Sequence, residues 1–297
     1  MDISMYILFY RTLVTLGAER AAELADLVGF DSVEMLEGRN LYNIPDEVSA
    51  RAVRSELDKK GLKMSCYSLA TEILSFNEKG ELEGLAEGLI QKAQRAVPIA
   101  KELGSPYFHH TLVLNLNSEL HSRRPSFDAV FDALIEGATK IAKKCNEQGM
   151  TVLYEPQGLY ANGINNFGRF YYEMKRLGYD VGICGDVGNV IFADERPLDF
   201  FKKYAEEFRH VHVKDYKSLG KIEALEKGCL RSKSGVAYME TYIGDGVVDF
   251  CGCMDVLKNI GYKGAISLEM ETLGDDPISE SRKAIKKINE IFVSERK

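Results

Sequence analysis

Short runs of apolar residues alternate along the chain with longer stretches in which apolar residues recur every three to four positions. The short runs are rich in β-branched and aromatic residues and are typical of strands, whereas the longer stretches are typical of amphipathic helices. This alternation predicts a parallel sheet whose strands are joined by helical crossovers. The eight predicted strands are residues 5–9, 31–35, 63–68, 107–111, 151–155, 181–185, 211–214 and 265–269.

Helical periodicity fills most of the intervals between these strands. The predicted helices are residues 18–28, 83–103, 127–148, 167–177, 198–208 and 254–260, followed by a final helix at 279–292. A glycine also stands shortly before six of the predicted strands, where it suits the left-handed position that ends a helix. These glycines are Gly29, Gly61, Gly104, Gly149, Gly178 and Gly261. Their recurrence indicates one repeated strand and helix unit.

Eight such units in 297 residues predict a single (β/α)8 barrel domain spanning residues 1–297, with an extra C-terminal helix. The chain has no Pro/Ser-rich linker or low-complexity tract between two halves, which disfavours a two-domain arrangement. An open doubly wound sheet is the alternative fold. No Gly-x-Gly-x-x-Gly turn follows any predicted strand, so the barrel is favoured.

Charge narrows the range of partners. The chain has 38 Lys and Arg against 45 Asp and Glu, for a formal net charge of −7. That sign argues against binding to duplex nucleic acid or to an anionic membrane surface. The apolar stretch at residues 5–10 is too short to span a membrane and has no basic segment or cleavage site beside it. We therefore expect a cytoplasmic protein that acts on a small molecule.

Four consecutive predicted strands end in polar side chains. Glu155 closes the fifth strand, Asp186 follows the sixth, His212 lies on the seventh and Glu269 closes the eighth. In a barrel the functional residues lie at the C-terminal ends of the strands, so these four are expected to converge. Three carboxylates and an imidazole suit Mn²⁺, Mg²⁺, Co²⁺ or Zn²⁺ better than a soft metal.

Each of these residues also has an ordinary structural explanation. A carboxylate after a strand is commonly a helix N-cap, and a histidine within a strand is commonly a hydrogen-bonded core residue. The occurrence of four such residues at four successive strand ends favours one shared site.

Several segments resemble the xylose isomerase-like barrel superfamily of sugar-phosphate isomerases and epimerases. They are YEPQG, GDVGNV, HVHVKDY, IGDGVVDF and GYKGAISLEME, and the resemblance is strongest from residue 151 to residue 271. Within that superfamily the chain resembles ketose 3-epimerases of the D-tagatose 3-epimerase and L-xylulose-5-phosphate 3-epimerase type. The resemblance implies that Glu155, Asp186, His212 and Glu269 hold one divalent metal ion, with Mn²⁺ as our first choice.

The resemblance also implies an isomerase mechanism. Glu155 and Glu269 would act as base and acid, removing and returning a proton next to a metal-polarised carbonyl, most simply at C3 of a ketose. An inosose dehydratase-like lyase begins with the same proton abstraction and remains an alternative. A noncatalytic sugar-binding barrel is a further alternative, expected if the four-residue set were incomplete. Endonuclease IV shares the barrel but uses more histidines for several zinc ions.

Three further residues are predicted to bind substrate near the strand ends. Alternation along the fourth strand lets one of His109 and His110 face the barrel interior, and we expect it to be His110. Asn189 stands where many relatives carry a histidine, and we expect it to bind a substrate hydroxyl. Lys214 would bind a hydroxyl or neutralise an enediolate, or else pair with a neighbouring carboxylate.

The segment from residue 214 to residue 233 is basic, with six Lys and Arg against three Asp and Glu. Arg231 or Lys233 would grip a phosphate or carboxylate on the substrate, since the Arg fork matches such groups bidentately. The alternative is a solvated loop. The segment is longer than the usual connection of about 2 to 6 residues, which favours a lid or a homo-oligomer contact.

Overall fold

Eight parallel strands close into a barrel in the computed structural model, which describes residues 1–37, 44, 46–112, 125–158, 160–222, 228–270 and 276–293. Every pairing around the barrel is parallel. The predicted (β/α)8 fold is confirmed. In spatial order the strands are β1 (Asp2–Met5), β13 (Ala265–Leu268), β9 (Phe208–Val213), β8 (Val181–Asp186), β7 (Thr151–Tyr154), β6 (Tyr107–Leu112), β3 (Lys63–Thr71) and β2 (Ser32–Glu37).

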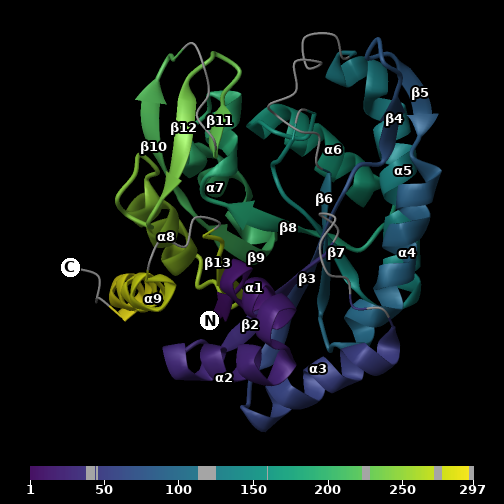
Figure 1. Cartoon of the computed structure of the whole chain (residues 1–297). Helices are drawn as coiled ribbons and strands as arrows, with labels where there is room; N and C mark the ends of the chain where they lie inside the picture. Colours follow the sequence, from purple (N-terminus) through teal and green to yellow (C-terminus); the bar gives the residue numbers. More distant parts are fainter. Residues whose placement is uncertain are drawn as a thin grey trace.

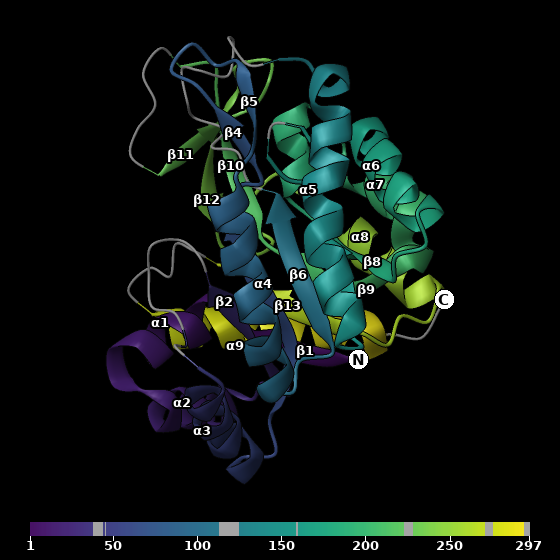
Figure 2. The ribbon, with the colours of Figure 1, turned by 90° about the vertical axis from the view of Figure 1, so that its right-hand side faces the viewer.

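Helices surround this barrel on its outside (Figures 1 and 2). They are α1 (Ile7–Leu16), α2 (Ala18–Val28), α3 (Glu47–Lys59), α4 (Glu87–Glu102), α5 (Phe127–Glu147), α6 (Ile164–Arg176), α7 (Pro197–Tyr204), α8 (Phe250–Asn259) and α9 (Pro277–Val293), with short 3-10 helices η2 (Asn189–Ala193) and η3 (Ala205–Glu207). The predicted C-terminal helix is α9, which packs against α2 and α8. Within the described residues, no helix combines the length and apolar character that crossing a membrane requires.

The main apolar core lies between strands and helices. Phe167 and Phe170 of α6 are fully buried, as are Phe200 of α7 and Phe108 of β6. The six glycines predicted to end helices all have positive φ, between 67° and 98°. The repeated unit that they indicated is therefore present, and it fixes where each new strand enters the barrel.

The first predicted strand is wrong. The strand is β1, at Asp2–Met5, and helix α1 begins at Ile7, inside the predicted range of 5–9. A short apolar run does not distinguish a strand from a buried helix segment. Here Phe9 and Leu13 are buried at helical spacing, so the run packs as a helix against the barrel.

Two groups of added strands lie beyond the C-terminal ends of the barrel strands. A hairpin of β4 (Leu74–Phe76) and β5 (Leu82–Leu85) follows β3, so the helix predicted at 83–103 begins only at Glu87. The segment expected to be a loop, 214–233, contributes β10 (Asp215–Gly220) and β11 (Cys229–Arg231) to an antiparallel sheet with β12 (Ala237–Thr241). Both groups lie at the top of Figure 1. We call β10, β12 and β11 the added sheet.

One buried carboxylate fastens the turn that follows the added sheet to the start of β10. Asp215 is fully buried and accepts four backbone hydrogen bonds. Oδ1 accepts from Tyr216 at 2.8 Å and from Val248 at 3.1 Å, and Oδ2 accepts from Gly244 at 2.9 Å and from Gly246 at 3.0 Å. A Cβ on Gly246 would come within 2.2 Å of Oδ1. The Gly-Asp-Gly turn therefore folds around Asp215.

Replacement of Asp215 by Asn should destabilise the protein without changing the size of the side chain. The new amide group would face N–H donors where a carboxylate oxygen stood, leaving donors unpaired at a cost of about 2 kcal/mol or more. Urea denaturation measures the change in the free energy of unfolding. Asp245→Asn is the control, because Asp245 is exposed in the same turn and its change should stay within about 0.5 kcal/mol. Equal stability of the two variants would contradict this anchoring role.

Candidate active site

Four of the predicted site residues meet at the C-terminal end of the barrel. Glu155 follows β7, Asp186 ends β8, His212 lies on β9 and Glu269 follows β13. All four are buried, and each offers one ligand atom that lies within 4.8 Å of the other three. Nδ1 of His212 is 3.3 Å from Oε2 of Glu155 and 3.1 Å from Oε2 of Glu269. We call these four residues the acidic cluster.

Lys214 lies inside this cluster. Its side chain is buried, and Nζ is 3.0 Å from Oδ2 of Asp186 and 2.9 Å from Oε2 of Glu269. The other oxygen of Asp186 accepts from the backbone N–H groups of Gly188 and Asn189. The ion pair considered for Lys214 on sequence grounds is thus present, within the site itself.

Burial and charge compete over the protonation of these groups. Burial raises the pKa of Asp186 to about 6, against the opposing effect of Lys214. Burial also raises the pKa of Glu269, but Lys214 and His212 outweigh it, and the net shift is downward. The pKa of Lys214 is raised in spite of burial, because Asp186 and Glu269 stabilise its charged form. The site retains its charges by pairing them.

The donor atoms of the cluster fit a divalent cation. Nδ1 of His212, Oδ2 of Asp186 and Oε2 of Glu269 are buried and make no well-directed hydrogen bond, although charged groups lie nearby. Three carboxylates also outnumber the two positive charges that Lys214 and a protonated His212 supply. Oxygen and imidazole nitrogen are the ligands that Mg²⁺, Mn²⁺ and Zn²⁺ accept. The acidic cluster therefore has both the atoms and the excess negative charge for such an ion.

The histidine of β6 that faces the cluster is His109, not His110 as predicted. His109 pairs in register with Ser68, its ring lies 5.1 Å from that of His212, and its Nε2 is 3.6 Å from Oε1 of Glu155. His110 points to the other face of the strand, with its ring 6.1 Å from that of Tyr154. Burial lowers the pKa of both histidines to about 3.

Asn189 lies at the edge of the cluster. It is buried, and its Nδ2 is 3.4 Å from Oε2 of Glu155.

Arg231 lies in the added sheet, where Nη1 donates to the carbonyl groups of Ile222 and Gly235 at 3.0 and 3.1 Å. This guanidinium therefore links the loops that precede and follow β11. Substrate binding by Arg231 stays a prediction.

Sequence reasoning missed a charged residue deeper in the barrel. Glu34 of β2 is fully buried, and its carboxylate contacts Nε2 of His210 at 2.7 Å and Nε2 of His212 at 2.9 Å. Burial raises the pKa of Glu34, but the two histidines outweigh it and the net shift is downward. The available signal was a glutamate inside the apolar run of β2, since an unpaired Glu is rarely fully buried. Tyr6 was also missed, and its ring stacks 5.0 Å from that of His212.

Comparison with protein families agrees with this geometry. The model of the xylose isomerase-like TIM barrel family matches residues 21–291. The chain belongs to the xylose isomerase-like TIM barrel family. The resemblance inferred from the sequence is thereby confirmed.

Proteins that are similar to this chain carry the names of different activities. An inosose dehydratase of Bacillus cereus (strain AH820) is 26% identical over 187 residues, so the alignment covers 61% of this chain and 61% of that enzyme. The structure of a D-allulose 3-epimerase from Methylomonas sp. superposes with a TM-score of 0.70 at 15% identity, covering 98% of each chain. A xylose isomerase-like TIM barrel protein from Mycobacterium smegmatis, in complex with magnesium, gives 0.69 at 15% identity, covering 98% of this chain and 96% of that one. The structural likenesses establish the fold.

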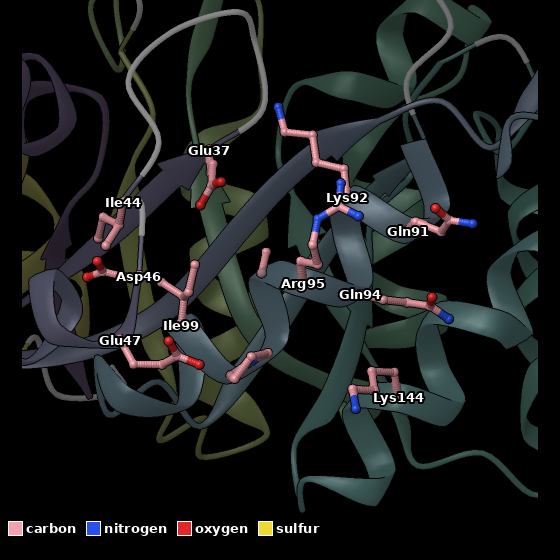
Figure 3. A pocket seen from close by; sticks show the side chains of 12 residues that line it. Glu37, Ile44, Asp46, Glu47, Gln91, Lys92, Gln94, Arg95, Ile99 and Lys144 are labelled. Carbon is pink, nitrogen blue, oxygen red and sulfur yellow. The ribbon is translucent and has the colours of Figure 1, made fainter. Parts of the chain in front are cut away.

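A groove of about 670 Å³ lies apart from the acidic cluster, lined by the end of β2 and by residues of α3, α4 and α5 (Figure 3). Glu37 enters it from β2, and Lys92 and Arg95 enter it from α4. Burial raises the pKa of Glu37 to about 7, with Lys92 opposing the rise. Glu37 is therefore a buried glutamate at a strand end that is not part of the cluster.

The raised pKa of Glu37 should make stability depend on pH. The stability that its neutral form contributes is complete below the unfolded pKa of about 4.3 and is lost as the pH rises through about 7. Glu37→Gln is neutral at every pH. The free energy of unfolding of the wild type relative to Glu37→Gln should thus fall by on the order of 3 kcal/mol across this range. Urea denaturation at a series of pH values tests this, and a difference that is independent of pH would contradict it.

Proposed function

We propose that this protein is a divalent-metal-dependent sugar epimerase that removes and returns a proton next to a ketose carbonyl, most simply at C3. The observation that carries the proposal is the approach of Glu155 and Glu269 to one point. They come from β7 and β13, with β8 and β9 between them, and both reach Nδ1 of His212. A base and an acid that act on opposite faces of one carbon need such an arrangement.

The acidic cluster would hold the cation through Glu155, Asp186, His212 and Glu269. When bound, a divalent ion polarises a carbonyl oxygen and so makes the neighbouring C–H bond more acidic. Zinc or magnesium is named for solved structures of this fold, and Mn²⁺ stays our first choice for this chain.

Glu155 and Glu269 would carry the proton. One carboxylate takes the proton from the carbon, and the C–H electron pair moves into a new C–C double bond as the carbonyl becomes an enediolate. The other carboxyl group gives a proton to the opposite face, and the carbonyl re-forms with the carbon inverted. The first group ends protonated and the second ionised, and exchange with solvent resets both. The configuration of the substrate decides which glutamate acts first.

Neighbouring side chains would position the substrate. Lys214 places a positive charge between Asp186 and Glu269, where an enediolate oxygen would develop negative charge. The amide of Asn189, 3.4 Å from Glu155, is suited to a substrate hydroxyl. The substrate class is a sugar or sugar phosphate, and Arg231 or Lys233 would meet a phosphate.

Inosose dehydration is a second candidate function, because curated relatives at 25–28% identity carry that name. The reaction starts with the same proton abstraction. It differs in the next step, where the electron pair expels a hydroxyl group, which takes a proton from a carboxyl group and leaves as water, and the carbon takes back no proton.

One screen separates the two functions. The purified protein, loaded in turn with Mn²⁺, Mg²⁺, Co²⁺ or Zn²⁺, is incubated in deuterated water with ketoses, ketose phosphates and inososes. An epimerase gives an epimer that carries one deuterium at C3, whereas a dehydratase gives a product lighter by one water, and mass spectrometry with NMR distinguishes them. A loaded protein that does neither with any of these substrates would overturn the proposal.

Replacement of the two glutamates should stop the proton transfer but leave the fold intact. At saturating cation, Glu155→Gln and Glu269→Gln should each lower kcat by about 10²- to 10⁴-fold, the usual contribution of a general acid or base. Glu37→Gln is the matched control, as a buried strand-end glutamate outside the cluster, and should exchange at the wild-type rate. Full deuterium exchange by Glu269→Gln would rule out its role in proton transfer.

A further inference from the structure

Glu34 joins three strands across the inside of the barrel. Its Oε2 is 2.7 Å from Nε2 of His210, and its Oε1 is 2.9 Å from Nε2 of His212. The hydroxyl of Ser68 on β3 also donates to Oε1. Strand β2, which carries Glu34, is separated from β9 by β1 and β13, so the contacts with His210 and His212 cross the barrel interior.

These contacts determine which nitrogen of His212 carries a proton. A carboxylate only accepts hydrogen bonds, so Nε2 of His212 must be the donor. In the neutral ring the lone pair is then on Nδ1, the nitrogen that lies 3.3 Å from Glu155 and 3.1 Å from Glu269. A metal ligand must present a lone pair, and only this tautomer presents it toward the acidic cluster.

A second branch from Glu34 reaches Glu155. The hydroxyl of Ser68 gives its proton to Glu34, so it accepts from Nδ1 of His109 at 2.8 Å. Nε2 of His109 then holds a lone pair, 3.6 Å from Oε1 of Glu155. Nε2 of His109 and Oε1 of Glu155 are then both acceptors, so no hydrogen bond joins them.

We propose that Glu34 is a positioning residue that holds His212 in its Nε2–H tautomer and thereby presents Nδ1 to the divalent ion. The proposal rests on the metal site of the proposed function and adds a residue from β2 to it. Carboxylates that accept from the distal nitrogen of a metal-bound histidine fix the ring and raise its basicity. The same carboxylate orients His109 through Ser68, so one buried group sets two rings beside Glu155.

Glu34→Gln is the informative variant, because it keeps the shape of the side chain. An amide group turned toward His212 would donate to Nε2 and so favour the Nδ1–H tautomer, which puts a proton where the ion binds. The dissociation constant for Zn²⁺ should then rise by about 10- to 100-fold, measured by titration calorimetry. Glu37→Gln is the control on the same strand. It should bind Zn²⁺ with nearly the wild-type affinity.

NMR of ¹⁵N-histidine-labelled protein provides a readout that a merely structural role would not move. In the wild type loaded with Zn²⁺, His212 should carry its proton on Nε2 and bind the metal through Nδ1. Its signals are assigned by their loss in His212→Gln. In Glu34→Gln this pattern should be lost, while urea denaturation confirms that the variant is folded.

The outcomes separate this inference from the proposed function. Wild-type affinity of Glu34→Gln for Zn²⁺ with the Nε2–H pattern retained would overturn it. If Glu34→Gln fails to fold, the wild type alone provides the test. Binding of Zn²⁺ through Nε2 of His212 in the wild type would overturn the inference. If the wild type binds no cation, the proposed function fails. In the metal-free protein, a downfield Nε2–H proton of His212 that is present in the wild type and lost in Glu34→Gln would then still show that Glu34 holds the tautomer, and its absence from the wild type would overturn that role.

Discussion

The structure depends on compensation of negative charge at the C-terminal end of the barrel. Three buried carboxylates that meet at one point repel one another unless positive charge or hydrogen-bond donors lie among them. Lys214 pairs with two of them, and the backbone N–H groups of Gly188 and Asn189 satisfy one oxygen of Asp186. A divalent ion would supply the rest. The excess of negative charge that makes this region costly to fold is therefore also what would attract a cation.

Polar groups in the barrel form two layers joined by His212. Glu34, Ser68 and His210 make the inner layer, and the acidic cluster makes the outer one. His212 belongs to both, since one ring nitrogen faces Glu34 and the other faces the cluster. Asp215, three residues after His212, anchors the added sheet. Strand β9 and the residues just after it thus connect the interior, the candidate site and the structure above it.

Much of the candidate site was predictable because the functional residues of a barrel lie at the C-terminal ends of its strands. Glu155 and Asp186 each interrupt an apolar run, and closure of the barrel brings such ends together whatever their distance in the chain. Predictions failed where the deciding information was not local. The run after Met5 has the apolar content of a strand but packs as a helix, and His109 replaces His110 because register with Ser68 sets the facing side.

The sequence by itself determined that eight strands form the barrel, the helix ends marked by glycine, and the polar residues that close strands five to eight, but it did not predict helices α1 and α3. Each of these follows from local periodicity and backbone preference. The tertiary structure alone decided that Glu34 meets His212, 178 positions along the chain. Their strands are not neighbours, so the contact exists only across the interior of the closed barrel, and no local pattern in either segment encodes it.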